Sequence, residues 1–470
     1  MIMTEKQVKT SWKLLLPLVL VAALAGSAMY AQNSGSSPAL LPAPASPPAA
    51  ASKVDTGDTA WMLISTALVM AMTPGLAFFY GGLVRRKNVL SILMQCFMIL
   101  CIISLQWALF GYSLAFAPGG SGFIGNLSFA GLSGVGAAPN AAYAPTIPHE
   151  LFMVFQMMFA VITPALIVGA FAERMKFSSF CIFSLLWATL VYDPVAHWVW
   201  GDGGFMGAKG WGALDFAGGT VVHINAGVAA LAAALVLGKR QGFAKNRISG
   251  PHNLPIAVLG AALLWMGWFG FNAGSALRAA GGDDPGLATN AFVVTHLATA
   301  GAGLAWCLLD WLKHGKPTTL GMITGAVAGL VAITPASGFV TPMGAIVIGL
   351  CAGLICWLSV TYLKTHFGYD DSLDAFGVHG VGGMFGAMAT GLFATISVNH
   401  GGGNGLFYGN PIQLWIQLKA VAVTAAYSFV VSLILLKAVD KIFGLRVEEH
   451  DERVGLDLTQ HKEAAYTVVD

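Results

Sequence analysis

The stretch Gly218-Gly-Thr-Val-Val-His-Ile-Asn225 places a histidine inside an otherwise apolar helical segment, and Phe376-Gly-Val-His-Gly-Val-Gly-Gly383 places a second one. A titratable side chain inside a membrane span is costly, so it normally faces a cavity or a partner and not lipid. His223 and His379 fall on the fifth and tenth apolar segments of the chain. The two stretches therefore predict an all-α polytopic membrane protein with a polar feature at its centre.

The composition of the chain supports a membrane location. Of the 470 residues, 56% are hydrophobic and only 10% are charged, with a net charge of +2. A soluble domain carries about 25% charged residues, so lipid must cover most of this surface. The near-neutral charge argues against a nucleic-acid partner. All six cysteines lie in apolar stretches, which favours free thiols over a disulfide framework.

The N-terminus has the features of an export signal. Three lysines precede the apolar run 14–25, and small residues at 26–28 suit cleavage. A Pro-, Ala- and Ser-rich segment follows, which is typical of a linker without a core. We predict a signal peptide (1–31), a linker (32–57), an eleven-helix membrane domain (58–442) and a cytoplasmic tail (443–470).

Apolar segments of roughly 20 residues, enough to cross about 30 Å of hydrocarbon, recur along the chain. They lie near residues 60–83, 89–117, 150–172, 178–201, 218–238, 254–276, 289–312, 318–335, 342–363, 378–398 and 412–436. These segments predict eleven transmembrane helices.

The loops between these segments alternate in charge. Every loop on one side carries Lys or Arg, whereas the loops on the other side hold only Lys209 and Arg278. Cytoplasmic loops carry the excess of Lys and Arg, so we predict a periplasmic mature N-terminus and a cytoplasmic C-terminus in a bacterial inner membrane. Because five is an odd number, spans one to five and spans six to ten cross the membrane in opposite orientations. This predicts a five-plus-five inverted repeat, which is common in transporters, and one extra C-terminal helix.

Glycines next to the two histidines let their helices approach closely, so the imidazoles are expected to meet and share a proton. A single histidine in a span has a packing role as often as a pore role. The pairing of His223 with His379 favours the pore. The sequence leaves open whether His296 contributes, and whether Asp193 adds negative potential to an outer vestibule. No metal is expected, because carboxylate or thiolate ligands for further coordination positions are missing.

Aromatic residues and one serine form a second constellation on three spans. They are Phe155 and Phe159 on the third span, Trp200 at the outer end of the fourth, and Trp268, Phe271 and Ser275 at helical spacing on the sixth. Aromatic belts at a membrane interface are ordinary. An aromatic face nevertheless attracts a cation by about 0.5–2 kcal/mol, and a serine hydroxyl accepts a hydrogen bond, so these residues suit a small cation.

Three segments, 215–227, 267–275 and 370–380, closely resemble ammonium transporters of the Amt/MEP/Rh superfamily. The resemblance covers residues 58–470, including the tail motifs Gly444-Leu-Arg-Val and Gly455-Leu-Asp. It implies an ammonium transporter or channel, not an enzyme, that forms a homotrimer of eleven-span subunits with one pore each and no cofactor.

The resemblance also implies roles for individual residues. They are an outer ammonium-recruiting site at Phe155, Trp200 and Ser275, a phenyl gate at Phe159 and Phe271, a twin-histidine pore at His223 and His379, and supporting positions at Asp215 and Trp268. Having Trp and Ser in the outer site favours the Amt branch. The implied mechanism recruits NH4+, deprotonates it and conducts NH3, with or without separate proton transfer.

Several alternatives stay open. The family's tail contacts a trimeric PII-type nitrogen-regulatory protein, whereas a polar tail without a domain-sized core is also compatible with a solvated segment. The whole protein is alternatively an ammonium sensor, or a pore for another small neutral solute such as methylamine or CO2. An intramembrane enzyme using His223 and Asp215 ranks far lower, because the sequence offers no nucleophile or metal motif.

Overall fold

The computed structural model describes residues 53–119, 122–243 and 250–466. The predicted signal peptide and residues 32–52 of the predicted linker lie outside the described residues. The first described helix begins at Thr56, where the side chain of Asp55 accepts a hydrogen bond of 2.9 Å from the backbone N–H of Asp58. This is the usual way in which an acidic residue caps a helix N-terminus.

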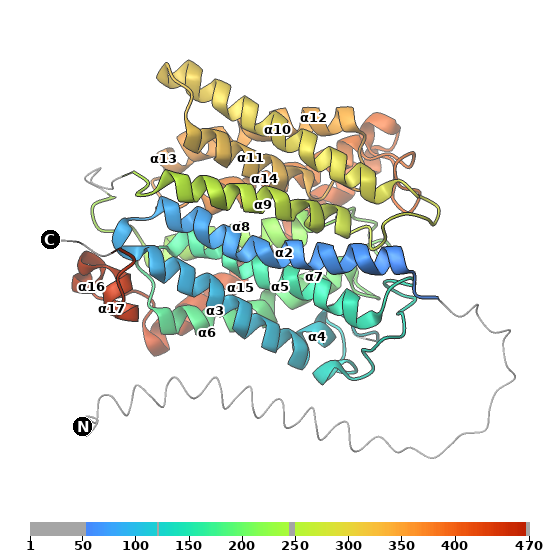
Figure 1. Cartoon of the computed structure of the whole chain (residues 1–470), viewed down its shortest axis with the longest axis horizontal. Helices are drawn as coiled ribbons and strands as arrows, with labels where there is room; N and C mark the ends of the chain where they lie inside the picture. Colours follow the sequence, from blue (N-terminus) through green and yellow to red (C-terminus); the bar gives the residue numbers. More distant parts are fainter. Residues whose placement is uncertain (1–52, 120–121, 244–249, 467–470) are drawn as a thin grey trace, which may run out of the picture.

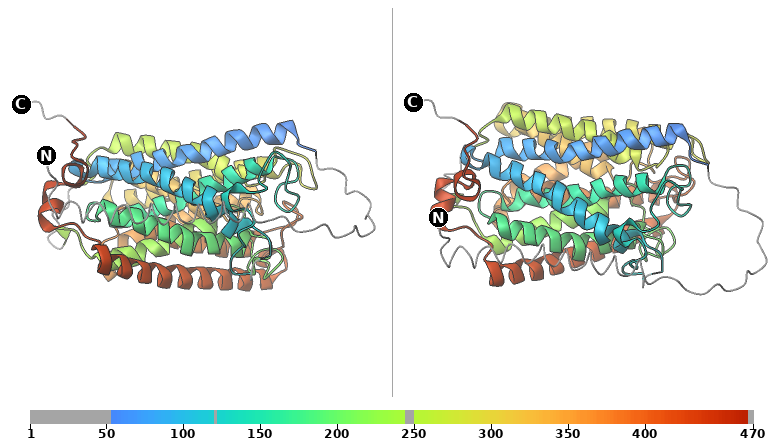
Figure 2. Two further views of the ribbon diagram at one scale, coloured as in Figure 1. Left: turned by 90° about the horizontal axis from the view of Figure 1, so that it is seen from below. Right: turned by 60° about the horizontal axis from the view of Figure 1, so that its bottom comes forward.

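The described chain is built from helices that run side by side along its long axis (Figure 1), and two further views show the same bundle (Figure 2). In chain order they are α2 (Thr56–Leu83), η1 (Arg86–Asn88), α3 (Val89–Gln106), η2 (Trp107–Gly111), α4 (Tyr112–Phe116), η3 (Ala130–Leu132), α5 (His149–Phe171), α6 (Phe177–Trp187), η4 (Ala188–Tyr192), α7 (Asp193–Trp200), η5 (Gly219–Ile224), α8 (Asn225–Leu237), α9 (Leu254–Gly274), α10 (Leu287–His314), α11 (Thr319–Ile333), α12 (Pro342–Leu358), η7 (Ser359–Leu363), α13 (Lys364–Phe367), η8 (Phe376–Gly380), α14 (Val381–Phe393), η9 (Leu406–Tyr408), α15 (Pro411–Phe443), α16 (Glu449–Val454) and α17 (Leu456–His461).

The predicted all-α membrane fold is confirmed. In the part of the chain that the structure describes, ten helical segments are long and apolar enough to cross a membrane. The eighth predicted span corresponds to α11, which has only 15 residues and ends at Ile333. Pro335 has no N–H to continue the helical hydrogen bonds, which accounts for the early end.

Several of the long helices contain a π-helical turn, a feature often found at functional sites. The turns η4 and η7 interrupt the fourth and ninth crossings, and η5 and η8 begin the fifth and tenth. The two halves of the molecule therefore share a local distortion at equivalent positions. This correspondence agrees with the inverted repeat expected from the topology.

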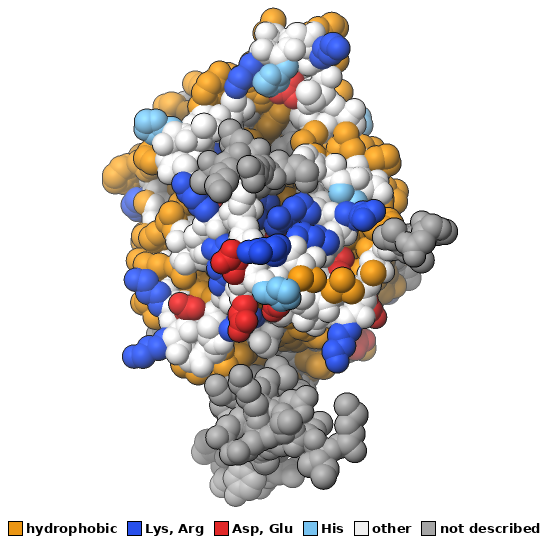
Figure 3. Space-filling view, turned by 90° about the vertical axis from the view of Figure 1, so that its left-hand side faces the viewer, with side chains coloured by type: hydrophobic (Ala, Val, Ile, Leu, Met, Phe, Trp, Pro, Cys, Tyr) orange, Lys and Arg blue, Asp and Glu red, His pale blue; other side chains and the backbone are white. Residues whose placement is uncertain are grey.

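The end of the bundle that carries α16 and α17 is rich in basic side chains. Figure 3 looks onto this end, where Lys and Arg side chains gather. Several of their charges are buried: Arg85 and Arg240 lie 2.9 and 3.2 Å from Glu173, and Arg240 also lies 2.9 Å from Asp370. The guanidinium of Arg174 donates to the backbone carbonyl of Asp370 at 2.6 Å. This ion network ties together four loops from both halves of the chain.

The described part of the tail is docked, in contrast to a freely solvated segment. The carboxylate of Asp457 accepts a hydrogen bond of 2.8 Å from the N–H of Ser91 at the start of α3. Arg446 pairs with Glu452 at 2.8 Å, and Glu452 also accepts from the N–H of Gln241 at 2.7 Å. The tail thereby contacts two segments of the first half of the sequence, one at the start of the second span and one after the fifth.

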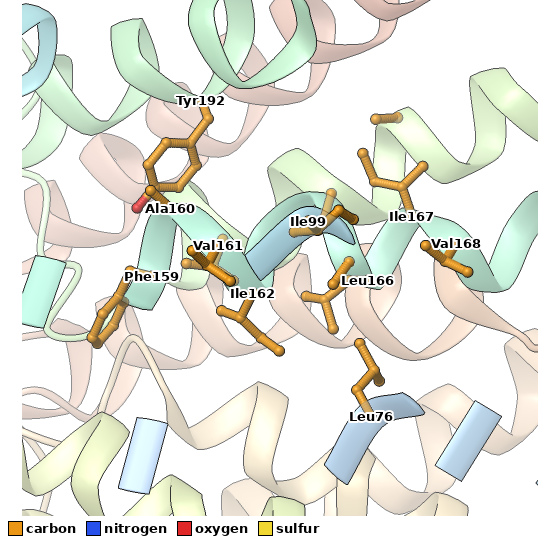
Figure 4. Packing of buried hydrophobic residues seen from close by; sticks show 14 of the residues in the cluster. Leu76, Ile99, Phe159, Ala160, Val161, Ile162, Leu166, Ile167, Val168 and Tyr192 are labelled. Carbon is orange, nitrogen blue, oxygen red and sulfur yellow. The ribbon is translucent and has the colours of Figure 1, made fainter. Parts of the chain in front are cut away.

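Helix α5 lies at the centre of the larger hydrophobic core. Figure 4 shows its side chains, among them Ile162 and Leu166, packed with Leu76 of α2, Ile99 of α3 and Tyr192 of η4. All five side chains are buried. A helix that is apolar all round, as α5 is, belongs inside a bundle and away from lipid, and this position lets α5 line the centre of the molecule.

The buried ion network predicts acid sensitivity. Burial alone would raise the pKa of Glu173 and of Asp370, but the neighbouring guanidinium groups hold both pKa values below their usual range. Each carboxylate therefore stabilises the fold fully above the unfolded pKa of about 4, and this contribution is lost as the pH falls through the lower folded pKa. We expect Glu173→Gln to cost about 1–3 kcal/mol at pH 7 and to flatten the loss of stability below pH 4.

The measurement is the thermal melting of purified protein in detergent between pH 3 and 8. The matched control is Glu448→Gln, an exposed carboxylate just before α16, for which we expect a change below about 0.5 kcal/mol. A Glu173→Gln variant with the wild-type melting profile would contradict this account of the network.

Candidate functional site

A cavity of about 310 Å³ opens at the end of the bundle opposite to α16 and α17, and Trp200 and Ser275 line it. Trp200 ends α7, and its indole N–H donates to the carbonyl of Asp215 at 2.9 Å, which fixes the ring. The hydroxyl of Ser275 donates to the carbonyl of Phe271 at 2.8 Å, so its lone pairs remain available as acceptors. The cavity thus presents an aromatic face and an acceptor oxygen together.

Two phenyl rings close the inner end of this space. The rings of Phe159 and Phe271 stack with centroids 4.1 Å apart and an interplanar angle of 25°. Phe155 packs edge-on against Phe159 at 5.0 Å and is fully buried. Phe155 is not among the described residues that line the outer cavity, so its place in the outer recruiting site stays a prediction.

Behind the phenyl rings, the two predicted histidines meet. The Nδ1 atoms of His223 and His379 lie 3.4 Å apart, which is a long hydrogen bond. The centroids of the two rings are 5.4 Å apart, with an interplanar angle of 23°. When both rings are neutral, one Nδ1 donates and the other accepts, so one Nε2 carries a proton and the other does not. The pair therefore offers one donor and one acceptor to a neighbouring molecule. The Nε2 of His223 has no hydrogen-bond partner among the described residues.

A second, very small cavity of about 10 Å³ lies beside the histidines and is otherwise lined by apolar side chains such as Leu264 and Val327. This volume holds about one water-sized molecule. A third cavity of about 510 Å³ opens at the basic end and shares His379 with the small one. The sequence from outer cavity to phenyl pair to histidines to inner cavity traces a path through the subunit.

Trp268 supports this arrangement from α9. Its ring stacks on His223 with centroids 5.4 Å apart at 20°. Its indole N–H donates to the hydroxyl of Thr334 at 2.8 Å, and that hydroxyl donates to the carbonyl of Leu330. The ring of His223 is therefore held between an anchored indole and the second imidazole.

The local sequence explains how His223 reaches this position. Gly218, the residue before η5, has a left-handed conformation, with φ of 115°, that suits glycine. The carboxylate of Asp215 then accepts hydrogen bonds from the N–H groups of Gly218, Gly219 and Thr220 at 2.6–2.7 Å, and from the hydroxyl of Thr220. A negative charge on the free N–H groups of a helix start is stabilising. Asp215 thus anchors the segment that carries His223.

The second histidine has an equivalent anchor. Asp371 stands eight residues before His379, as Asp215 stands eight residues before His223. Its carboxylate accepts from the N–H of Phe376 at 2.7 Å, at the start of η8. Sequence reasoning assigned no role to Asp371, although the shared spacing was a signal that would have identified it.

The two span residues whose role the sequence left open, His296 and Asp193, do not line the path. His296 is exposed on the surface of α10, beside the ring of Trp265 at 5.4 Å. Asp193 is completely buried at the start of α7, where it accepts from the amide of Gln106 at 2.7 Å. Asp193 is absent from the described lining of the outer cavity, so its carboxylate does not face that space, and its effect on the potential there stays a prediction.

Sequence reasoning missed other residues that line the outer cavity. Gln156 lies one position after Phe155, and its buried side-chain oxygen has no partner among the described residues. Asp202 and Lys209 bring charge to the cavity, on a loop that the sequence showed only as polar and glycine-rich. The sequence carries no distinct signal for Gln156, because the rotation of the helix decides whether Phe155 or Gln156 faces the cavity. The path of the loop decides the same for Asp202 and Lys209.

Comparison with known proteins gives consistent similarities. The family model of the Ammonium Transporter Family matches residues 60–466. An ammonium transporter of Bacillus subtilis is 55% identical over 410 residues, which are 87% of this chain and 98% of that protein. The crystal structure of Candida albicans Mep2 is 39% identical with a TM-score of 0.78, covering 84% of this chain and 87% of that one. The structure of a sensor Amt protein is 31% identical with a TM-score of 0.77, covering 86% of this chain and 98% of that one.

The anchor at Asp215 predicts a stability effect. In Asp215→Asn, the amide group replaces one acceptor oxygen and faces backbone N–H donors, so we expect a loss of about 1–3 kcal/mol in the free energy of unfolding. Thr220→Val removes only the hydroxyl contact and is expected to cost less. Unfolding in mixed micelles by titration with SDS measures both, and equal stability of Asp215→Asn and wild type would refute the anchoring role.

Proposed function

This chain belongs to the Ammonium Transporter Family, and from that premise we propose that it takes up NH4+ at the outer cavity, removes a proton and conducts NH3 past the twin histidines. The observation that carries the proposal is the Nδ1-to-Nδ1 contact of His223 and His379 beside a cavity of about 10 Å³. The contact leaves ring nitrogens facing a space that fits one small molecule. No residue in the proposal acts as an enzyme catalyst.

Recruitment by Trp200 and Ser275 rests on attraction by groups that carry no net charge. The face of Trp200 attracts a cation by about 0.5–2 kcal/mol, and the hydroxyl of Ser275 and the amide oxygen of Gln156 can each accept an N–H. An NH4+ ion gives up its water more readily than a strongly hydrated alkali ion and replaces it with these acceptors. Phe159, at 6.0 Å from Trp200, completes the aromatic wall.

Passage of the intact cation beyond the phenyl pair is disfavoured. Moving a bare ion into an apolar interior costs many kcal/mol, and apolar side chains surround the small cavity apart from the two histidines. Neutral NH3 is close to water in size and fits the cavity volume of about 10 Å³. Rotation of Phe159 and Phe271 out of their stack is the movement required to admit it.

The histidine pair suits NH3 because it offers a donor and an acceptor at once. The molecule can accept from one Nε2 and donate to the other, which offsets the loss of its hydrogen bonds to water. The proton released outside the phenyl pair travels either along the shared Nδ1 contact or apart from it. Joint measurement of current and uptake separates these two routes.

The assembly and location follow from the same family resemblance. We propose a homotrimer in a bacterial inner membrane, with the outer cavity facing the periplasm and the tail in the cytoplasm. Basic side chains at the end of the bundle that carries the docked tail support this orientation. We also propose that a PII-type regulatory protein binds that end, which co-purification from cell extract with and without residues 443–470 tests.

A sensing role is the second candidate, because a sensor Amt protein shares this fold. A sensor needs to bind ammonium but to pass little of it. Accumulation of labelled methylammonium in cells without other ammonium carriers distinguishes the two functions. Accumulation above the background of cells without this protein favours transport.

The histidine pair predicts the coupling between proton and ammonia. In proteoliposomes, we expect an ammonium jump to give a current that falls by at least about 100-fold in a His223→Ala/His379→Ala variant, because a relay that transfers a proton is lost. His296→Ala, on the exposed face of α10, is the control and is expected to match wild type. Equal electrical silence in wild type and in the double variant, with uptake present, would refute proton carriage by the pair.

The outer cavity predicts a change in apparent affinity. Trp200→Leu removes the aromatic face and is expected to raise the KM for ammonium by about 2- to 30-fold, which corresponds to the usual range of a cation–π contact. Trp415→Leu, on the exposed surface of α15, is the matched control. Uptake kinetics in the same vesicles measure both, and an unchanged KM in Trp200→Leu would exclude recruitment by this ring.

A further inference from the structure

Asp202 and Lys209 are the two charged side chains among the described residues that line the outer cavity. The Nζ atom of Lys209 lies 2.6 Å from the Oδ1 atom of Asp202. Both side chains reach solvent, with 36% of Asp202 and 75% of Lys209 exposed. The pair therefore stands at the solvent-exposed side of the cavity, and Asp202 lies two residues along the chain from Trp200.

The backbone that carries Asp202 is firmly positioned. Its N–H donates to the hydroxyl of Tyr143 at 2.9 Å, and that hydroxyl donates to the carbonyl of Phe116 at 2.6 Å. The ring of Tyr143 stacks on Phe152 with centroids 5.0 Å apart at 9°. In contrast, Lys209 is a long side chain on a glycine-rich turn. The backbone at Asp202 is thus anchored by a hydrogen bond, whereas the side chain of Lys209 is mostly exposed and has room to leave the carboxylate.

The side chain of Lys209 is chemically the closest analogue of the substrate that a protein contains. It ends in a primary ammonium group with three N–H donors, and NH4+ has four. A carboxylate that binds this group at 2.6 Å also has the geometry to bind free NH4+. With Lys209 in contact, Asp202 is occupied, and with Lys209 swung into solvent, the carboxylate is open beside Trp200.

We propose that Asp202 is an outer capture site for ammonium ions, at which Lys209 competes as a tethered analogue of the substrate. This inference rests on the proposed function and adds a step before the aromatic site. An ion held by Asp202 has already entered the cavity, and transfer to Trp200 and Ser275 needs no further crossing of bulk water. Lys209 keeps the site from holding the ion too long.

The expected effect is modest, because exposed charge pairs interact weakly and are screened by salt. We expect Asp202→Asn to raise the KM for ammonium about two- to fivefold, because Lys209 then stands unpaired and repels cations. We expect Lys209→Gln to lower the KM by a similar factor, because the carboxylate is then free. The maximal rate is expected to stay the same in both variants.

The test is ammonium and methylammonium uptake by the full chain in proteoliposomes, at about 20 mM and 200 mM salt. The opposite changes in KM should be smaller at the higher salt concentration. The KM of the Asp202→Asn/Lys209→Gln variant should fall between the KM values of the single variants. Asp283→Asn removes an exposed carboxylate from the α9–α10 loop, outside the described lining of the cavity, and should leave the KM unchanged.

The outcomes separate this inference from the proposed function. If both single variants raise the KM, the pair only holds the loop in shape, and the inference is overturned. An unchanged KM in Asp202→Asn also overturns it, while uptake that depends on Trp200 and the histidines leaves the proposed function standing. Absence of uptake by the wild type would overturn both.

Discussion

The close crossing of two backbones at Gly227 and Gly380 is the constraint on which the rest of the site depends. A Cβ atom on Gly227 would overlap the backbone N and Cα of Gly380, so only glycine lets α8 and η8 approach this closely. Gly383 lies in the same crossing, where a Cβ would stand 3.0 Å from the Cβ of His223. Without this contact, the two imidazoles on either side would not reach each other across the interface between the halves.

Both histidines lie within a π-helical turn next to this crossing, His223 in η5 and His379 in η8. The first N–H groups of a helix have no partner within the helix. Asp215 and Asp371 accept hydrogen bonds from such groups at the starts of η5 and η8. An anchor, a π turn and a histidine recur in both halves, although their loops differ. The two halves therefore resemble each other more in this unit of carboxylate, π turn and histidine than in the rest of their sequences.

Much of this was predictable from the chain. Hydropathy placed the spans within a few residues, because burying an apolar segment in lipid depends on composition alone, and His223 with His379 stood out because ionisable groups in spans are rare. Other features depend on tertiary contacts that a single sequence does not encode in a readable way. Phe155 sits behind Phe159 through the rotation of α5, and the tail docks through hydrogen bonds to the backbone, as Asp457 does with Ser91.

The distribution of charge along the path also has a physical reason. Among the described residues that line the three cavities, charged side chains occur at the outer mouth, with Asp202 and Lys209, and in the inner cavity, with Arg240, Asp310 and Asp374, but not in the small central space. A fixed charge in that dry centre would either trap a cation or need a costly counter-charge of its own. Neutral imidazoles avoid both, since they form hydrogen bonds without a permanent field. In the proposed function, the charged pair at the mouth meets an ion where water still screens it, and a neutral centre makes the loss of a proton the easier way through.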